Sequence, residues 1–166
     1  KGDWGVLADI EVYEVYKWTE FISYFVWDYF YNENKRWWAW ADELRDRFWN
    51  KKSIVINVLN IVKSESWKTL LTLGEVETLY HEFGHGIHSM LSKSKYSDLS
   101  WFWVERDFVE LPSQILEKWS TDILAINDVA SHFETWEKLW DDMLNSLGKL
   151  KYFSYISNNK SKVIWI

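Results

Sequence analysis

Residues 73–92 read LGEVETLYHEFGHGIHSMLS, and their pattern predicts the clearest helix of the chain. Apolar side chains recur along this segment at three- and four-residue spacing, as on one face of an α-helix: Val76, Leu79, Tyr80, Phe83, Ile87 and Leu91. Side chains four residues apart in such a helix lie about one turn apart on the same face. The spacing of the polar residues in this segment therefore says which of them lie together.

This helix carries an H-E-x-x-H motif that begins at His81 and ends at His85. Two imidazoles so placed can bind one Zn²⁺, and Glu82 between them can reach a metal-bound water. A lone motif of this kind also occurs by chance on ordinary helices. Metal binding is favoured because the helix is strongly amphipathic, because His88 adds a third histidine, and because a carboxylate follows on the next predicted helix.

That carboxylate, Glu110, is the predicted third ligand, since a zinc peptidase needs three protein ligands and one open position. We expect one Zn²⁺ per chain, bound by His81 and His85 as neutral imidazoles and by Glu110. Glu82 would not bind the metal. It would take the proton of the water that attacks a peptide carbonyl and pass a proton to the leaving amine. The motif therefore predicts a metal-dependent peptidase.

Three further residues lie near the predicted ligands. His88 is interpreted as a helix-face residue near the metal, because a fourth protein ligand would close the site. Asp107 and Ser113, one turn before and after the ligand carboxylate, either orient a ligand or are a surface side chain and a backbone-bonded hydroxyl. Glu77 is interpreted as a carboxylate at the helix N-terminus.

Composition excludes several classes of protein. The 166 residues amount to one ordinary domain, and 48% of them are hydrophobic, enough for a core. The net charge of -6 gives no electrostatic support for binding nucleic acid. There is no cysteine, which excludes disulfides and thiolate metal sites. The apolar stretch Ile54–Val62 is too short and too polar to span a bilayer. The chain begins at Lys1 without an initiator methionine, and we expect it to be a piece of a longer product.

The N-terminal part predicts strands. Asp9–Lys17 and Phe21–Tyr31 read as two antiparallel strands joined by a short turn, and Ser53–Val62 as a third strand. Ala39–Phe48 reads as a short helix or an irregular connection. The strand Ser53–Val62 either binds the substrate backbone by β-addition or is an ordinary core strand.

The C-terminal part predicts further helices. Ser94–Trp103 reads as a connecting loop, and Glu105–Ser120 as a helix whose hydrogen bonding Pro112 disturbs. Helical stretches follow at Asp122–Phe133 and Glu137–Lys149.

The predicted fold class is α+β and predominantly helical, with a small antiparallel sheet followed by the H-E-x-x-H helix and more helices. Residues 1–166 would form a single partial catalytic domain, with a β-rich part at 9–62, a helical zinc-binding part at 73–150 and an unassigned tail at 151–166.

Two motifs together carry a family resemblance. HEFGHGIH at 81–88 and VERDFVELPSQ at 104–114 resemble the thimet oligopeptidase family of zinc metallopeptidases, to which oligopeptidase A and peptidyl-dipeptidase belong. Looser matches extend the resemblance to roughly Ile10–Leu150: Gly74–Tyr80, Tyr24–Lys35 and Ala39–Arg45.

The resemblance implies zinc bound by His81, His85 and Glu110, with Glu82 as general base, in part of a zincin-like catalytic domain. It also implies a metalloendopeptidase that cleaves short peptides inside a deep channel in the cytoplasm, with no nucleic-acid or membrane partner. Nothing after Leu150 matches the family's downstream helices, so we expect the oxyanion-stabilising groups and the channel walls to belong to a missing remainder of the parent enzyme. The alternatives are a truncated relic that binds metal or peptide without turnover, and a purely structural helical domain.

Tryptophan stands where the family has glycine. The chain has 14 Trp but only 6 Gly. A tryptophan cannot easily adopt the positive φ that glycine adopts freely in turns. We therefore interpret several tryptophans as UGA codons that the source reads as glycine, the alternative being genuine drift to tryptophan: Trp18, Trp37, Trp38, Trp67, Trp101 and Trp136. Trp119 is interpreted as genuine, because it falls on the apolar side of a predicted helix.

Overall fold

The structure is a computed structural model, and it describes residues 9–47, 51–65, 68–94 and 103–149. The chain divides into two compact units, Lys1–Glu117 and Lys118–Ile166, which are described one at a time. Most of the predicted loop Ser94–Trp103, the tail 151–166, Trp67 and Trp101 lie outside the described residues.

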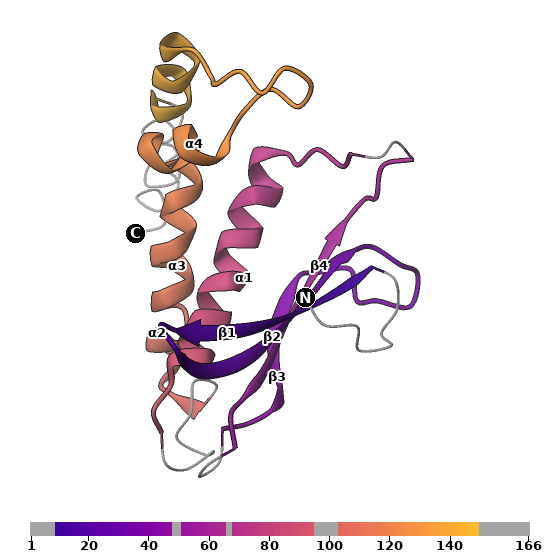
Figure 1. Cartoon of the computed structure of the whole chain (residues 1–166), viewed down its shortest axis with the longest axis vertical. Helices are drawn as coiled ribbons and strands as arrows, with labels where there is room; N and C mark the ends of the chain where they lie inside the picture. Colours follow the sequence, from indigo (N-terminus) through magenta and orange to yellow (C-terminus); the bar gives the residue numbers. More distant parts are fainter. Residues whose placement is uncertain (1–8, 48–50, 66–67, 95–102, 150–166) are drawn as a thin grey trace, which may run out of the picture. The chain divides into compact units, whose positions relative to one another are not determined.

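The first unit contains a four-stranded mixed sheet (Figure 1). Its strands are β1 (Ile10–Lys17), β2 (Glu20–Phe30), β3 (Trp40–Arg45) and β4 (Ile54–Ile61), in the spatial order β1-β2-β4-β3. β1 pairs with β2, and β3 with β4, in antiparallel orientation, whereas β2 and β4 run parallel. The prediction of an antiparallel sheet is therefore wrong. Alternation of side chains shows that a segment is extended but says nothing of its direction relative to its neighbour.

β3 was not predicted as a strand. The segment Ala39–Phe48 was expected to be a short helix or an irregular connection, because Ala, Glu, Leu and Arg favour helices. It pairs instead with β4 from Trp40 to Arg45, as the outermost strand of the sheet. Its charged residues suit an edge strand, which faces solvent on one side. Pairing with β4 outweighs the local helix propensity.

α1 (Leu73–Leu91) covers one face of this sheet, and the helix expected at 73–92 is confirmed. Thr72 and Glu75 form a capping box at its start. The core lies between helix and sheet and includes Phe25, Leu59 and Met90. A Cβ at Gly86 would lie 2.8 Å from the Phe25 ring, so α1 rests closely on the sheet at that point.

The predicted helix Glu105–Ser120 is broken. α2 (Arg106–Val109) ends before Glu110, and α3 (Leu111–Glu117) begins beside Pro112, which cannot donate a backbone hydrogen bond. α3 packs along α1, so that α1 lies between the sheet and α3 (Figure 1).

The second unit contains a 3₁₀ turn, η3 (Lys118–Thr121), and α4 (Ile123–Val129). The Asp122 side chain caps α4 by accepting from the backbone N–H groups of Leu124 and Ala125. α4 ends earlier than the predicted Asp122–Phe133, and residues 141–149 are helical. Helices hold 40% and strands 28% of the described residues, so the fold is α+β without a strong predominance of helix. Within those residues, no helix is long and apolar enough to cross a membrane.

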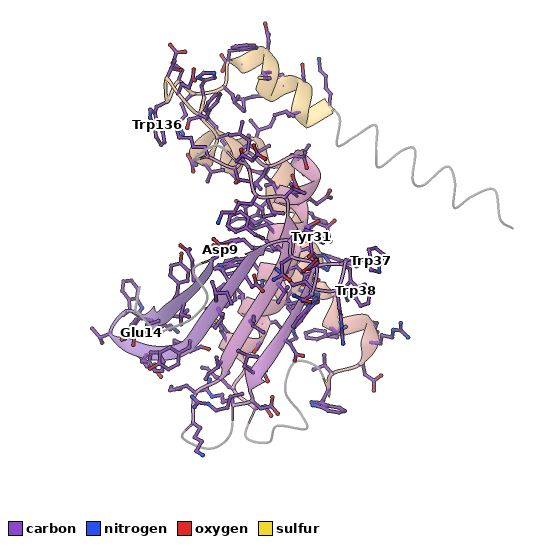
Figure 2. The ribbon with its side chains drawn as sticks, turned by 90° about the vertical axis from the view of Figure 1, so that its right-hand side faces the viewer. Asp9, Glu14, Tyr31, Trp37, Trp38 and Trp136 are labelled. Atoms are coloured by element: carbon purple, nitrogen blue, oxygen red, sulfur yellow. The ribbon has the colours of Figure 1, made fainter. Side chains whose placement is uncertain are left out.

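Among the described residues, two tryptophans have a left-handed backbone, which bulky side chains rarely adopt. φ is 58° at Trp18, in the turn between β1 and β2, and 62° at Trp136. Both side chains are largely exposed, and Trp37 and Trp38 also project from the surface (Figure 2). Trp119 is 55% exposed in η3 rather than packed on an apolar side.

Candidate metal centre

The predicted ligands lie together at the junction of α1 and the segment between α2 and α3. Glu110 Oε2 lies 3.3 Å from His81 Nε2 and 3.2 Å from His85 Nε2. One ligand atom from each of the three residues lies within 4.8 Å of the others. Two histidines one turn apart on α1 and a carboxylate from a second element therefore converge on one point.

The chemistry of this donor set fits Zn²⁺. Two imidazole nitrogens and one carboxylate oxygen form a three-ligand set of the kind that leaves a fourth position open. An imidazole binds a metal only in its neutral form. Burial lowers the pKa of His85, although the Glu110 carboxylate opposes this, so the buried ring favours its neutral form.

A close approach of two helices brings Glu110 to the histidines. A Cβ at Gly84, inside the H-E-x-x-H motif, would lie 2.5 Å from Ser113 Cα and 2.8 Å from the Pro112 carbonyl oxygen. Real Cβ atoms essentially never come so near backbone atoms. Glycine at position 84 therefore sets the distance between α1 and α3.

Ser113 holds the carboxylate of the predicted ligand Glu110. Its side chain is fully buried, and its hydroxyl lies 2.9 Å from both Glu110 Oε2 and the Glu110 carbonyl oxygen. Glu110 Oε2 is the oxygen that faces both histidines. The two interpretations of Ser113 thus describe one side chain, which bonds to the backbone and also contacts the carboxylate.

The other two candidates lie farther from the three ligand atoms. Asp107 is exposed on α2. His88 packs its ring against Phe108, with 5.8 Å between ring centroids, and burial lowers its pKa. Among the described residues, neither belongs to the group that could hold a metal ion.

Glu82 is 7% exposed between the two histidines. Burial raises the pKa of its carboxyl to about 7; His81 opposes this rise and Glu110 adds to it. Together with the ligands it lines a cavity of about 410 Å³, whose other wall includes residues 38–41 at the start of β3. The group that could exchange a proton near neutral pH therefore faces space that a ligand can enter.

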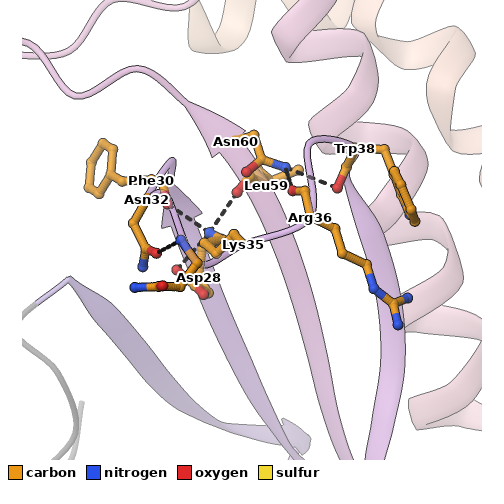
Figure 3. A network of polar contacts seen from close by, with 9 residues as sticks. Asp28, Phe30, Asn32, Lys35, Arg36, Trp38, Leu59 and Asn60 are labelled. Carbon is orange, nitrogen blue, oxygen red and sulfur yellow. Dashed lines mark hydrogen bonds and ion pairs between the residues drawn. The ribbon is translucent and has the colours of Figure 1, made fainter.

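The strand beside this cavity is β3, whereas the sequence left open whether Ser53–Val62 binds a substrate or is a core strand. β4 is paired on both sides, so Ser53–Val62 is a core strand. The turn that leads into β3 is held by Asn60, whose side-chain amide donates to the carbonyls of Arg36 and Trp38, each at 2.9 Å (Figure 3). Nearby, the Lys35 ammonium group bonds to the carbonyls of Phe30 and Leu59 at 2.7 Å and joins β2 to β4 (Figure 3).

Sequence reasoning missed Glu117. Its Oε2 lies 2.9 Å from His81 Nδ1, on the side of the ring away from the other ligands. Glu77, interpreted as a helix-start carboxylate, lies beside Glu117 instead, and burial and the Glu117 charge raise the pKa of its carboxyl; the cap belongs to Glu75. The available signal was spacing, because residues 110 and 117 are seven apart and would share one face of the unbroken helix predicted at Glu105–Ser120.

Comparison with known proteins places the chain in a protein family. The sequence profile described as Peptidase family M3 matches residues 5–163. The chain is 45% identical over 76 residues to mitochondrial intermediate peptidase of Candida albicans, covering 46% of this chain and 10% of that protein. It is 29% identical over 150 residues to dipeptidyl carboxypeptidase of Escherichia coli, covering 88% and 22%. It is 33% identical over 147 residues to oligopeptidase A of Escherichia coli, covering 84% and 22%. The chain thus spans no more than 22% of the length of these relatives.

Proposed function

The chain belongs to peptidase family M3, and from this premise we propose that it forms the catalytic core of a zinc metalloendopeptidase that hydrolyses short peptides. The observation that carries the proposal is the meeting of His81, His85 and Glu110 beside a buried glutamate. We further propose that residues 1–166 belong to one zincin-like catalytic domain.

His81, His85 and Glu110 are the proposed zinc ligands, with Ser113 holding the carboxylate of Glu110. Zinc bound there would lower the pKa of water and polarise the carbonyl of the scissile bond. The three side chains present their ligand atoms from two elements on one side and leave the cavity on the other side free for a substrate.

Glu82 is the proposed general base. A carboxyl whose pKa lies near 7 can accept the proton of an attacking water and return a proton to the leaving amine at neutral pH. Its position in the cavity wall beside the ligands supports this role.

β3 is the proposed strand along which a peptide binds. An edge strand offers unpaired backbone groups to an extended peptide, and the start of β3 lines the cavity. Short peptides in extended form therefore match the site better than folded proteins do. The cytoplasmic location stays a prediction, because the relatives include proteins named for mitochondria.

A relic that binds metal or peptide without turnover is the second candidate. The observation that favours it is Trp38. The bulky ring of this residue lines the cavity at a position where the family that the chain resembles has a glycine-rich turn.

Hydrolysis of a quenched fluorescent peptide by the zinc-loaded protein separates the two candidates. We expect cleavage by the wild type and a loss of about a hundredfold or more in Glu82→Gln, since general bases contribute rate factors of that order. Peptide binding without cleavage, in a protein shown to contain zinc, would establish the relic instead.

A further inference from the structure

A histidine that binds a metal needs its ring held in one orientation, and His81 has a partner for this in α3. The His81 ring directs Nε2 toward Glu110 and Nδ1 toward Glu117 Oε2, at 2.9 Å. A carboxylate oxygen can only accept, so Nδ1 carries the proton in this contact. The neutral ring then has its lone pair on Nε2, the atom that faces the other two ligands.

We propose that Glu117 is a positioning residue of the metal centre, which fixes the tautomer and the orientation of His81 through its hydrogen bond to Nδ1. The proposal rests on the proposed metal site, and it adds a residue that neither the H-E-x-x-H motif nor the Glu110 segment identifies.

The arrangement of the two helices supports this role. His81 lies one turn from His85 on α1. On the facing side, Glu110 precedes α3 and Glu117 ends it, seven residues later. The His81 ring therefore has a carboxylate beside each of its two nitrogens. The close contact at Gly84 keeps α3 in place beside α1.

The Glu117 carboxylate is itself held in place. Glu77 on α1 lies beside it, one turn before His81 on the same face; burial and the Glu117 charge raise the pKa of the Glu77 carboxyl, and its protonated form donates to Glu117. Glu117 thus touches α1 at two positions one turn apart. A carboxylate fixed in this way can orient a ring, because its own rotamers are restricted.

Two substitutions at one position test the hydrogen bond. Glu117→Gln keeps an oxygen that can accept from Nδ1–H but removes the charge, whereas Glu117→Leu removes the acceptor at similar size. Glu105→Gln is the matched control, since Glu105 is exposed at the start of α2 and makes no side-chain capping bond.

The measurement is the dissociation constant of Zn²⁺, by competition with a chromophoric chelator, in the intact protein. We expect weakening by about tenfold or more in Glu117→Leu, a smaller effect in Glu117→Gln, and no more than twofold in Glu105→Gln. Histidine ¹⁵N shifts of the metal-free protein should show the Nδ1–H tautomer of His81 in the wild type and a mixture in Glu117→Leu.

The outcomes are distinct. A wild type that binds no Zn²⁺ would remove the metal site and this proposal together. Tight wild-type binding that Glu117→Leu leaves within twofold would overturn the role of Glu117 alone. If Glu117→Leu does not fold, Glu117→Gln decides: Zn²⁺ binding that is weaker than in Glu105→Gln sustains the role of Glu117, and an affinity and a His81 tautomer population that both match the wild type overturn it.

Discussion

Gly84 of α1 faces Ser113 of α3 so closely that a Cβ at position 84 would lie 2.5 Å from Ser113 Cα. The glycine belongs to the H-E-x-x-H motif, and the serine bonds to the Glu110 carboxylate. One backbone contact therefore determines whether a ligand from a second element can reach two histidines of α1.

Gly84→Ala should displace α3 from α1. We expect it to lower the free energy of unfolding by about 1–3 kcal/mol, the usual cost of overpacking, and to weaken Zn²⁺ binding. Gly74→Ala is the control, because a Cβ at Gly74 meets nothing within 4 Å, and alanine there should be neutral or stabilising. Chemical denaturation and zinc titration check both variants. Equal stability of the two would mean that the Gly84 contact does not set the helix spacing.

Ser113→Ala should leave the Glu110 carboxylate without the hydroxyl that holds it. We expect a loss of about tenfold in Zn²⁺ affinity, the lower end of what removal of such a partner causes. Ser146→Ala removes an exposed hydroxyl that bonds only to its own helix at Asp142, and it serves as the matched control. Isothermal titration with Zn²⁺ measures the affinity of both variants, and equal affinities would contradict the role of Ser113.

The buried carboxyl of Glu43 on β3 should make the free energy of unfolding depend on pH. Its carboxyl is held below α1, where the Ser89 hydroxyl donates to it, and burial raises its pKa to about 7, with Asp46 and Asp42 adding to the rise. The folded-state pKa lies above the ordinary glutamate value of 4.5. The folded state therefore binds the proton more tightly, and ionisation costs stability.

The contribution of Glu43 to the free energy of unfolding should consequently fall as pH rises from about 4.5 to about 7 and stay lower above that range. Glu43→Gln, which cannot ionise, should reduce this fall, while Glu33→Gln in an exposed turn should leave it as in the wild type. Urea denaturation at pH 5 and pH 8 checks this. If the free energy of unfolding changes by the same amount between pH 5 and pH 8 in the wild type and in Glu43→Gln, Glu43 does not cause the pH dependence.

Replacement of Trp18 or of Trp136 by glycine should stabilise the protein. A bulky residue with a left-handed backbone costs on the order of 1–3 kcal/mol, and φ is 58° and 62° at these positions. Trp18→Gly and Trp136→Gly should each raise the free energy of unfolding by about 1 kcal/mol. Trp140→Gly, at an exposed tryptophan without a positive φ, should give no such gain.

Trp18 and Trp136 also test whether the source translates UGA codons as glycine. If the source reads UGA as glycine, peptide mass spectrometry of the native protein will find glycine at Trp18 and Trp136. Tryptophan found at both positions would refute the codon interpretation.

The sequence predicted which residues of α1 lie together at the candidate site, because helical spacing fixes which side chains share a face. α1 ends within one residue of its expected boundary, and the two histidines lie where that period places them. The sheet was predicted less well. β3 consists largely of helix formers, and its pairing with β4 outweighs their propensity. The parallel pairing of β2 and β4 depends on a connection whose path no local pattern specifies.

Glu117 escaped prediction for a related reason. Its contact with His81 depends on the distance between two helices, which Gly84 sets through packing. Pro112 also interrupts the predicted helix, so the seven-residue spacing from Glu110 was hard to read as one face. Contacts that depend on tertiary packing follow from sequence only after the packing is known.

The most direct test is the zinc content of the protein purified without chelators, measured by inductively coupled plasma mass spectrometry beside Glu110→Gln and the exposed control Glu105→Gln. We expect about one Zn²⁺ per chain in the wild type and in Glu105→Gln, and a severe loss in Glu110→Gln, because three protein ligands define the site. Full zinc content in Glu110→Gln, or none in the wild type after reloading with Zn²⁺, would contradict a metal centre built from His81, His85 and Glu110.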